Sequence, residues 1–357
     1  MLAGMSTEPL AETASLLKLR TPLDIVDAVP HLVGFQPENS LVCLSLRGAR
    51  KRLGVVSRAD LPPVRFAREF ATQTVRYLRH DGAQQVIVVF YPDDEGPADG
   101  RVVGLLDALV KALDKRSIDV VEALCVYDGR WWSLLCGDEK CCPPEGTPID
   151  QGRTTVVAAE MAARGRVVFK SRAELEHTIA PVSGAAARDM RAELSRARAE
   201  LQARLASGER AAVAAESIKL WDDAVRGRHP VAKPAPLLRS DDAARLIVAL
   251  DDVLVRDQIL TWAEGDRAEA LQRLLAELAP RAMKGFEAPV LTVLALACYV
   301  QGEGALASIA IERARHAEPD YNLARIVDDA LLRCVNPTVL RSWMRSVRDH
   351  LSDPPSR

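Results

Sequence analysis

Apolar and polar residues in the N-terminal part of the chain follow patterns typical of short β-strands. The runs LVCLSL (41–46) and LGVVSRADL (53–61) flank a turn and predict a β-hairpin. QQVIVVFY (84–91) is apolar almost throughout, as expected of a strand that is covered on both faces of its sheet. Asp128-Gly129 separates DVVEALCVYD (119–128) from RWWSLLC (130–136), and this dipeptide is a strong signal for a second hairpin.

Helical spacing separates these strands. Residues 64–80 and 101–116 repeat apolar positions at the period of an amphipathic helix. An earlier helix, capped by Thr21, is expected to end near Pro30, because proline interrupts helical hydrogen bonding. The resulting order α, β, β, α, β, α, β, β predicts an α/β domain with a mixed sheet and helices packed on it.

The pattern changes at about residue 156. Strand-like runs nearly vanish, apart from RVVF (166–169), and helical segments dominate. A proline-rich stretch at 229–238 predicts a break between helices. We therefore expect a tail at 1–18, an α/β domain at 19–155, a connecting segment at 156–185, an all-α helical domain at 186–350 and a second tail at 351–357.

One helical hairpin in the second half resembles a repeat unit. In residues 288–319, large and small apolar residues mark one face of each of two helices, and Gly302 and Gly304 form the turn between them. Small residues at such a crossing let two helices approach closely, as in a tetratricopeptide-type unit. The equivalent small positions are not repeated 34 residues earlier. An ordinary hairpin of a helical bundle is the alternative.

Composition narrows the functional classes. The chain has 47 basic and 49 acidic residues in 357, a net charge of -2, so nucleic-acid binding would need a local basic patch. The sequence has no signal-peptide pattern and no apolar run long enough for a membrane span, so we expect a cytoplasmic protein that binds neither membranes nor nucleic acid. In that compartment the seven cysteines are expected to be thiols, metal ligands or transient redox groups.

The segment WWSLLCGDEKCCPPEGTPID (131–150) carries the least ordinary chemistry. Cys136 and Cys141 are separated by four residues, and Cys142 follows directly, which suggests one half of a zinc site. Adjacent cysteine side chains diverge, however, and the remaining ligands would come from elsewhere: Cys125, Asp138, Glu139, Glu145 or a distant histidine such as His177. A redox pair and simple packing of the thiols beside the tryptophans are the alternatives.

Other candidate residues are few. The sequence contains no phosphate-binding loop, dinucleotide fingerprint, zinc-protease motif or hydrolase elbow, which favours a non-enzymatic role. Arg58 and Asp60 point to the same face of a strand, where they form either an exposed ion pair or a polar ligand site. With Trp131 and Trp132 they are the residues we expect around any pocket of the α/β domain.

Several of these segments together resemble a known family. They are TPLDIVDAVPHLVGFQPENSLVCLSL (21–46), SRADLP (57–62), RWWSLLC with CCPPEGTPI, and residues 288–326. Over roughly residues 19–335 the chain is similar to the actinobacterial family catalogued as domain of unknown function 4192. The resemblance implies a cytoplasmic protein and supplies no catalytic residue.

Two functional hypotheses follow. The first is an interaction, regulatory or scaffold protein whose helical C-terminal domain binds a protein partner, with self-association as an option. The second is an enzyme or small-molecule sensor on the α/β domain, with a metal or redox segment at Cys136, Cys141 and Cys142.

Overall fold

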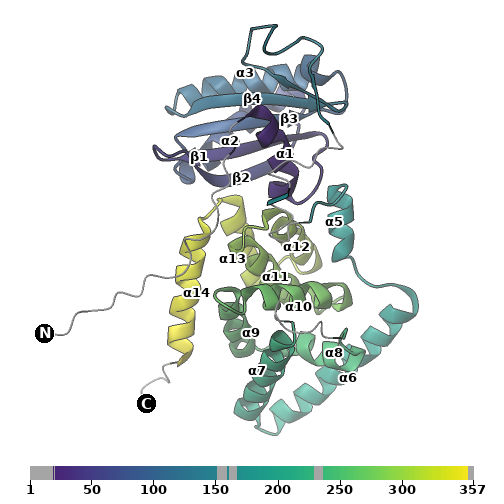
Figure 1. Ribbon diagram of the computed structural model, residues 1–357. Helices are drawn as coiled ribbons and strands as arrows, with labels where there is room; N and C mark the ends of the chain where they lie inside the picture. The colour runs from purple at the N-terminus through teal and green to yellow at the C-terminus, as the bar shows by residue number, and fades with distance from the viewer. Residues whose placement is uncertain (1–18, 20, 151–158, 161–166, 229–235, 353–357) are drawn as a thin grey trace, which may run out of the picture.

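The computed structural model describes residues 19, 21–150, 159–160, 167–228 and 236–352 (Figure 1). A mixed sheet with helices forms the N-terminal part and a helical region follows, which confirms the predicted fold class. The predicted tail at 1–18, most of the tail at 351–357, most of the proline-rich break and part of the connecting segment lie outside the described residues. No helix among the described residues combines the length and apolar character that a membrane crossing needs.

The sheet has six strands in the order β2-β1-β3-β4-β5-β6. They are β1 (Ser40–Arg47), β2 (Arg52–Asp60), β3 (Gln85–Tyr91), β4 (Asp119–Tyr127), β5 (Arg130–Ser133) and β6 (Thr147–Pro148). β3 and β4 pair in parallel, and every other neighbouring pair is antiparallel. β5 stops three residues before the predicted end at Cys136, and β6 was not predicted because two residues carry no periodic signal.

Helices cover both faces of the sheet. α1 (Pro22–Val33) packs on the face formed by Val42, Leu44 and their neighbours, while α2 (Ala67–His80) and α3 (Gly100–Asp114) pack on the opposite face, formed by Leu41 and Cys43. Short 3-10 turns precede the latter two helices, at Val64–Phe66 and Gly96–Ala98. Two covered faces explain why the apolar run of β3 is continuous.

The predicted end of the first helix near Pro30 is wrong. α1 continues to Val33 and ends at Gly34, whose φ of 85° is left-handed and whose N–H donates to the carbonyl of Pro30 at 2.8 Å. Pro30 lies in the last turn, so its missing N–H removes a single helical hydrogen bond. The cap is as predicted, because the Thr21 hydroxyl accepts from the Asp24 N–H and the Asp24 carboxylate accepts from the Thr21 N–H.

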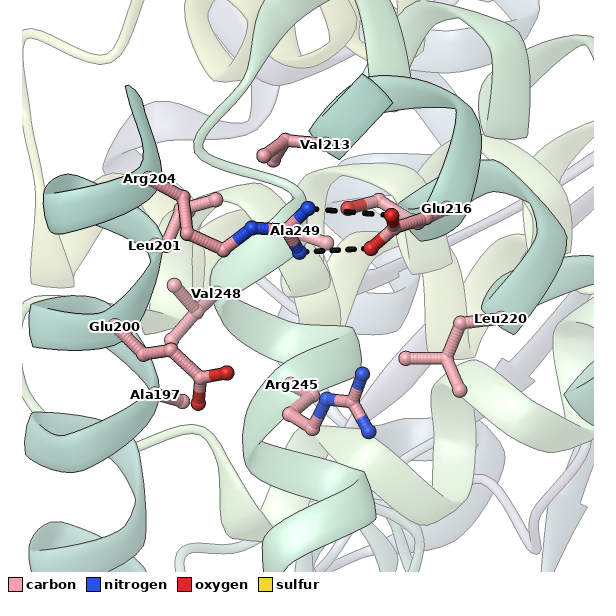
Figure 2. A pocket seen from close by; sticks show the side chains of 11 residues that line it. Ala197, Glu200, Leu201, Arg204, Val213, Glu216, Leu220, Arg245, Val248 and Ala249 are labelled. Atoms are coloured by element: carbon pink, nitrogen blue, oxygen red, sulfur yellow. Dashed lines mark hydrogen bonds and ion pairs between the residues drawn. The ribbon is translucent and has the colours of Figure 1, made fainter. Parts of the chain in front are cut away.

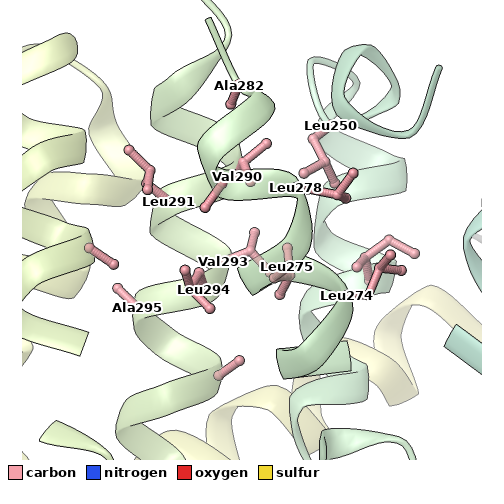
Figure 3. Packing of buried hydrophobic residues seen from close by; sticks show 14 of the residues in the cluster. Leu250, Leu274, Leu275, Leu278, Ala282, Val290, Leu291, Val293, Leu294 and Ala295 are labelled. Carbon is pink, nitrogen blue, oxygen red and sulfur yellow. The ribbon is translucent and has the colours of Figure 1, made fainter. Parts of the chain in front are cut away.

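The second part is a set of packed helices. They are α5 (Arg172–Thr178), α6 (Gly184–Ala206), α7 (Arg210–Arg226), α8 (Ser240–Ala249), α9 (Val253–Leu260), α10 (Ala268–Leu278), α11 (Glu287–Val300), α12 (Gly304–Ala317), α13 (Asn322–Leu332) and α14 (Pro337–Ser352), with 3-10 turns at Thr261–Ala263 and Ala279–Arg281. Leu275 of α10 lies toward Val293 of α11, whereas Leu274 points away from α11, and all three belong to one buried cluster (Figure 3).

α11 and α12 form the predicted hairpin around Gly302, whose φ is 82°. α11 is buried on all sides, since every residue from Ala288 to Cys298 is buried. A helix enclosed in this way is typical of the centre of a helical bundle. The tetratricopeptide-like character of the hairpin therefore stays a prediction.

The two parts of the chain meet at Phe35. Phe35 forms an isolated parallel β-bridge with Phe169. Phe169 is the last residue of the strand-like run predicted at 166–169. Phe169 donates its N–H to the Gly34 carbonyl at 2.9 Å, and its own carbonyl accepts from Gln36 at 3.0 Å. The Phe35 side chain is 2% exposed and packs with the core of the helical region.

Candidate functional site

The candidate site is the loop that follows β5. Its first hydrogen bond, from the Leu134 N–H to the Ala123 carbonyl at 2.7 Å, extends the pairing with β4 by one residue. The chain then reverses around Asp138, whose carbonyl accepts from the N–H groups of Cys141 (3.1 Å) and Cys142 (2.7 Å). The Asp138 carboxylate also accepts from the Lys140 N–H at 2.9 Å. This turn carries both later cysteines back to the first.

The thiols of Cys136, Cys141 and Cys142 converge. Their three Sγ atoms all lie within 4.8 Å of one another. The sequence argument that adjacent cysteine side chains diverge does not apply here, because the turn at Asp138 directs both toward Cys136. No fourth His, Cys, Asp or Glu joins the group in the part of the chain that the structure describes, so Cys125 and His177 do not complete it.

The three thiols lie at the surface and interact electrostatically. Cys141 is exposed, and Cys136 and Cys142 are partly exposed. The Asp138 N–H, followed by the neighbouring thiols, lowers the pKa of Cys136 by hydrogen bonding. Partial burial, and then the two neighbouring thiols, raise the pKa of Cys142 to about 12. The Cys136 thiolate is therefore favoured over that of Cys142, and the group resists further negative charge unless a cation compensates it.

A second turn holds the loop against Trp132. The indole Nε1 donates to the Pro144 carbonyl at 2.9 Å, and Arg130 donates to the Gly146 carbonyl at 2.8 Å. Gly146 has a φ of 77°, and a Cβ placed on it would lie 2.4 Å from Cε2 of Trp132. Glycine at this position therefore lets the turn lie directly on the indole ring, which in turn fixes the loop that carries Cys142.

The structure does not gather the four predicted pocket residues. Trp132 pairs with Cys125 on the α2 and α3 face, whereas Trp131 is buried with α1 on the opposite face. Arg58 and Asp60 form an ion pair at 2.7 Å, and Arg58 also donates to the Ser40 hydroxyl at 2.8 Å. The Arg58 side chain is mostly buried and the Asp60 side chain is exposed.

Sequence reasoning missed a polar group under α1. Tyr91 and Trp131 are 6% and 9% exposed, and neither the Tyr91 hydroxyl nor the Trp131 Nε1 has a hydrogen-bond partner in the described structure. Burial, followed by the nearby Asp27 carboxylate, raises the pKa of Tyr91. The alternation of side chains along β3 and β5 could have indicated this group, because it places the Tyr91 and Trp131 rings on the same face of the sheet.

Comparison with known proteins adds one finding. A family model described as a domain of unknown function (DUF4192) matches residues 22–338, which is most of the chain. The chain belongs to this family. The predicted membership over roughly residues 19–335 is thus confirmed. No curated protein and no solved structure matches the chain.

The DUF4192 chain also has a small cavity among α6, α7 and α8 (Figure 2). Its volume is about 60 Å³, which is room for a few water molecules and far below that of a metabolite site. Arg204 closes one side through two hydrogen bonds to Glu216, at 2.7 and 3.2 Å, and these bonds hold the pKa of Glu216 below its usual range. Arg204 and Glu216 are thus used in internal ion pairing, and Glu200 and Arg245 are the other charged side chains of the lining.

Proposed function

We propose that Cys136, Cys141 and Cys142 bind a thiophilic metal ion, with zinc the expected occupant, and that the N-terminal part acts as a metal-dependent binding module. The convergence of three Sγ atoms within 4.8 Å carries the proposal. Thiolates around a tetrahedral zinc ion, with bonds of about 2.3 Å, lie about 3.8 Å apart. Small rotations of the cysteine side chains would therefore bring the three sulfurs to bonding distance.

Three protein ligands leave the fourth position of a tetrahedral ion open. This pattern is typical of zinc sites that bind water, a substrate or an external ligand, whereas purely structural sites have four protein ligands. Because Cys141 is exposed, an external ligand has access to that position. These features favour the sensor or enzyme hypothesis over a structural zinc knuckle.

A redox function is the competing interpretation of the same thiols. Any two of them could form a disulfide, and a lowered pKa at Cys136 favours the reactive thiolate. The two interpretations differ in what the reduced protein retains. A metal site holds its ion under reducing conditions, whereas a redox pair does not need one.

The test is metal content, measured by plasma mass spectrometry on reduced protein purified without a histidine tag. We expect near-stoichiometric metal in the wild type and loss of most of it in Cys136→Ser, Cys141→Ser and Cys142→Ser. Cys334→Ser, at a partly exposed cysteine between α13 and α14, is the matched control and should retain the metal. Metal-free wild type that also fails to take up zinc or cobalt would refute the proposal.

Partner binding by the helical region is a second candidate. Four large apolar side chains on the last two helices are exposed, namely Ile326, Leu332, Val339 and Trp343. Val339 and Trp343 are four residues apart on α14 and so share one face of that helix, and neighbouring exposed apolar groups favour an association surface, including self-association. Sedimentation velocity should show an associating wild type, a monomeric Trp343→Glu and an unchanged Leu237→Glu control; a monomeric wild type at all concentrations would exclude self-association.

A further inference from the structure

A groove of about 1270 Å³ lies between α2 and α3, on the face of the sheet opposite α1. Its apolar lining comes from small side chains of both helices, namely Ala67, Val75, Ala108 and Ala112, with Gly104 among them. Val64 lines the groove as well and is 54% exposed. Ala67, Val75 and Ala108 are themselves buried in the core, so the open apolar surface of the groove comes from Val64, Gly104 and Ala112.

The sides of the groove are strongly basic. Six cationic side chains line it, whereas Glu69 and Asp107 are its two carboxylates; the cations are Arg68, Arg76, Arg79, Lys111, Lys115 and Arg116. Lys111 is paired with Asp107 at 2.6 Å. The other five cations have no carboxylate partner among the described residues. On α6, Arg196, Arg198 and Arg204 are ion-paired, whereas Arg188 and Arg191 have no carboxylate partner among the described residues.

The topology concentrates this charge. α2 leads into β3 and α3 leads into β4, and these strands are parallel, so the two helices run in the same direction. Their C-terminal ends therefore lie at the same end of the groove, which Arg76, Arg79, Lys115 and Arg116 all line. A basic residue in the last turn of a helix interacts favourably with the dipole of that helix. This effect accounts for one or two cations on each helix, but it does not account for cations on both helices that line the same groove.

We infer that this groove binds an acidic, amphipathic helical segment of a partner protein. Its apolar face would cover Val64, Gly104 and Ala112, and its flanking carboxylates would pair with the free cations on both sides. α3 has 15 residues, so the groove spans about 22 Å, or about four turns of a bound helix.

A nucleic-acid strand fits the groove less well. Phosphates would use the cations but leave the exposed apolar surface at Val64, Gly104 and Ala112 uncovered. Single-strand binding sites also present several aromatic rings for base stacking. In this groove Tyr77 is the one aromatic ring, and its hydroxyl accepts a hydrogen bond from Gln73 at 2.7 Å.

The test is fluorescence anisotropy with the full chain and three labelled probes. The first is a helical peptide of about 15 residues, matched to α3, with leucines on one face and glutamates beside them. The second has the same composition with the leucines dispersed, and the third is an oligothymidylate of similar length. Arg76→Glu/Arg79→Glu reverses two free cations of the groove. Arg188→Glu/Arg191→Glu is the matched control, because both arginines are exposed, unpaired and on α6.

We expect the amphipathic peptide to bind at least about fivefold more tightly than the dispersed one. The groove variant should weaken that binding about tenfold or more, and the control variant should leave it unchanged. Equal binding of the two peptides, equal loss in both variants, or no binding of either peptide would overturn the inference. Tighter binding of the oligothymidylate would overturn it in favour of a nucleic-acid site.

Discussion

Gly146→Ala tests whether the turn at 143–146 needs glycine both for its backbone conformation and for its close approach to Trp132. The first is conformation, because a φ of 77° is left-handed and disfavours any residue with a Cβ. The second is space, because the new Cβ would lie 2.4 Å from Cε2 and 2.8 Å from Nε1 of Trp132. The indole would have to move, and its hydrogen bond to the Pro144 carbonyl would be lost.

The expected loss has two parts. A left-handed alanine costs about 1 kcal/mol, and the displaced ring with its lost hydrogen bond costs about 1 to 2 kcal/mol more. Gly129→Ala separates them, since Gly129 has a φ of 68° but no heavy atom within 4 Å of its added Cβ. It should lose only the conformational part, about 1 kcal/mol.

Urea-induced unfolding followed by circular dichroism measures both variants against the wild type, and the difference between the two variants is the quantity of interest. Gly146→Ala should be the less stable by at least about 1 kcal/mol. Equal free energies of unfolding for the two variants would show that the turn does not lie against the Trp132 ring as described. The same experiment on metal-loaded protein should show whether moving the turn also disturbs Cys142.

Three further predictions concern buried polar groups. Tyr91→Phe removes a buried hydroxyl without a partner and should leave the free energy of unfolding unchanged or raise it by up to about 1 kcal/mol; a clear loss in urea unfolding would instead indicate a bound water. Arg228→Met leaves the Glu277 carboxylate, 15% exposed, without its closest cation and should cost about 3 kcal/mol in the same assay, whereas a loss below about 1 kcal/mol would show that the pair is solvated. Burial raises the pKa of Asp99, but hydrogen bonds from Arg101 outweigh burial and hold the pKa below its usual 3.8. The ionised carboxylate therefore stabilises the fold above pH 3.8. This stabilisation is lost as the pH falls through the folded-state pKa. Asp99→Asn should therefore lower the thermal midpoint at pH 7, and its gap to the wild type should narrow as the pH falls below 3.8; a constant gap would contradict this linkage.

Periodicity predicted most of the fold, because strands and amphipathic helices bury alternate or helically spaced side chains regardless of their neighbours. It failed where a few local hydrogen bonds decide the outcome. Pro30 did not end α1, since in the last turn it removes one bond, and β6 is too short to show a pattern. The fold class was therefore accessible from the sequence, and the ends of elements were not.

The candidate site was only partly accessible for a related reason. The types of residue at Cys136, Cys141 and Cys142 indicated metal chemistry, but their convergence depends on the turn at Asp138, which spacing does not encode. The grouping of Trp131 with Trp132 overlooked the fact that successive residues of a strand face opposite sides. The basic groove needed the parallel direction of two helices, which became known only from the strand pairing.

Phe35 has a consequence for how the protein can be divided. It belongs by sequence to the N-terminal part, yet its ring is buried in the core of the helical region and its backbone neighbours bond to Phe169. A fragment cut at residue 155 would keep this ring and the Arg58 guanidinium that lies over it, but it would lose the helical side chains that bury the ring and so expose an apolar surface. The two halves thus share buried contacts. Transfer of either half into another protein would require the segment of the other half that contacts it.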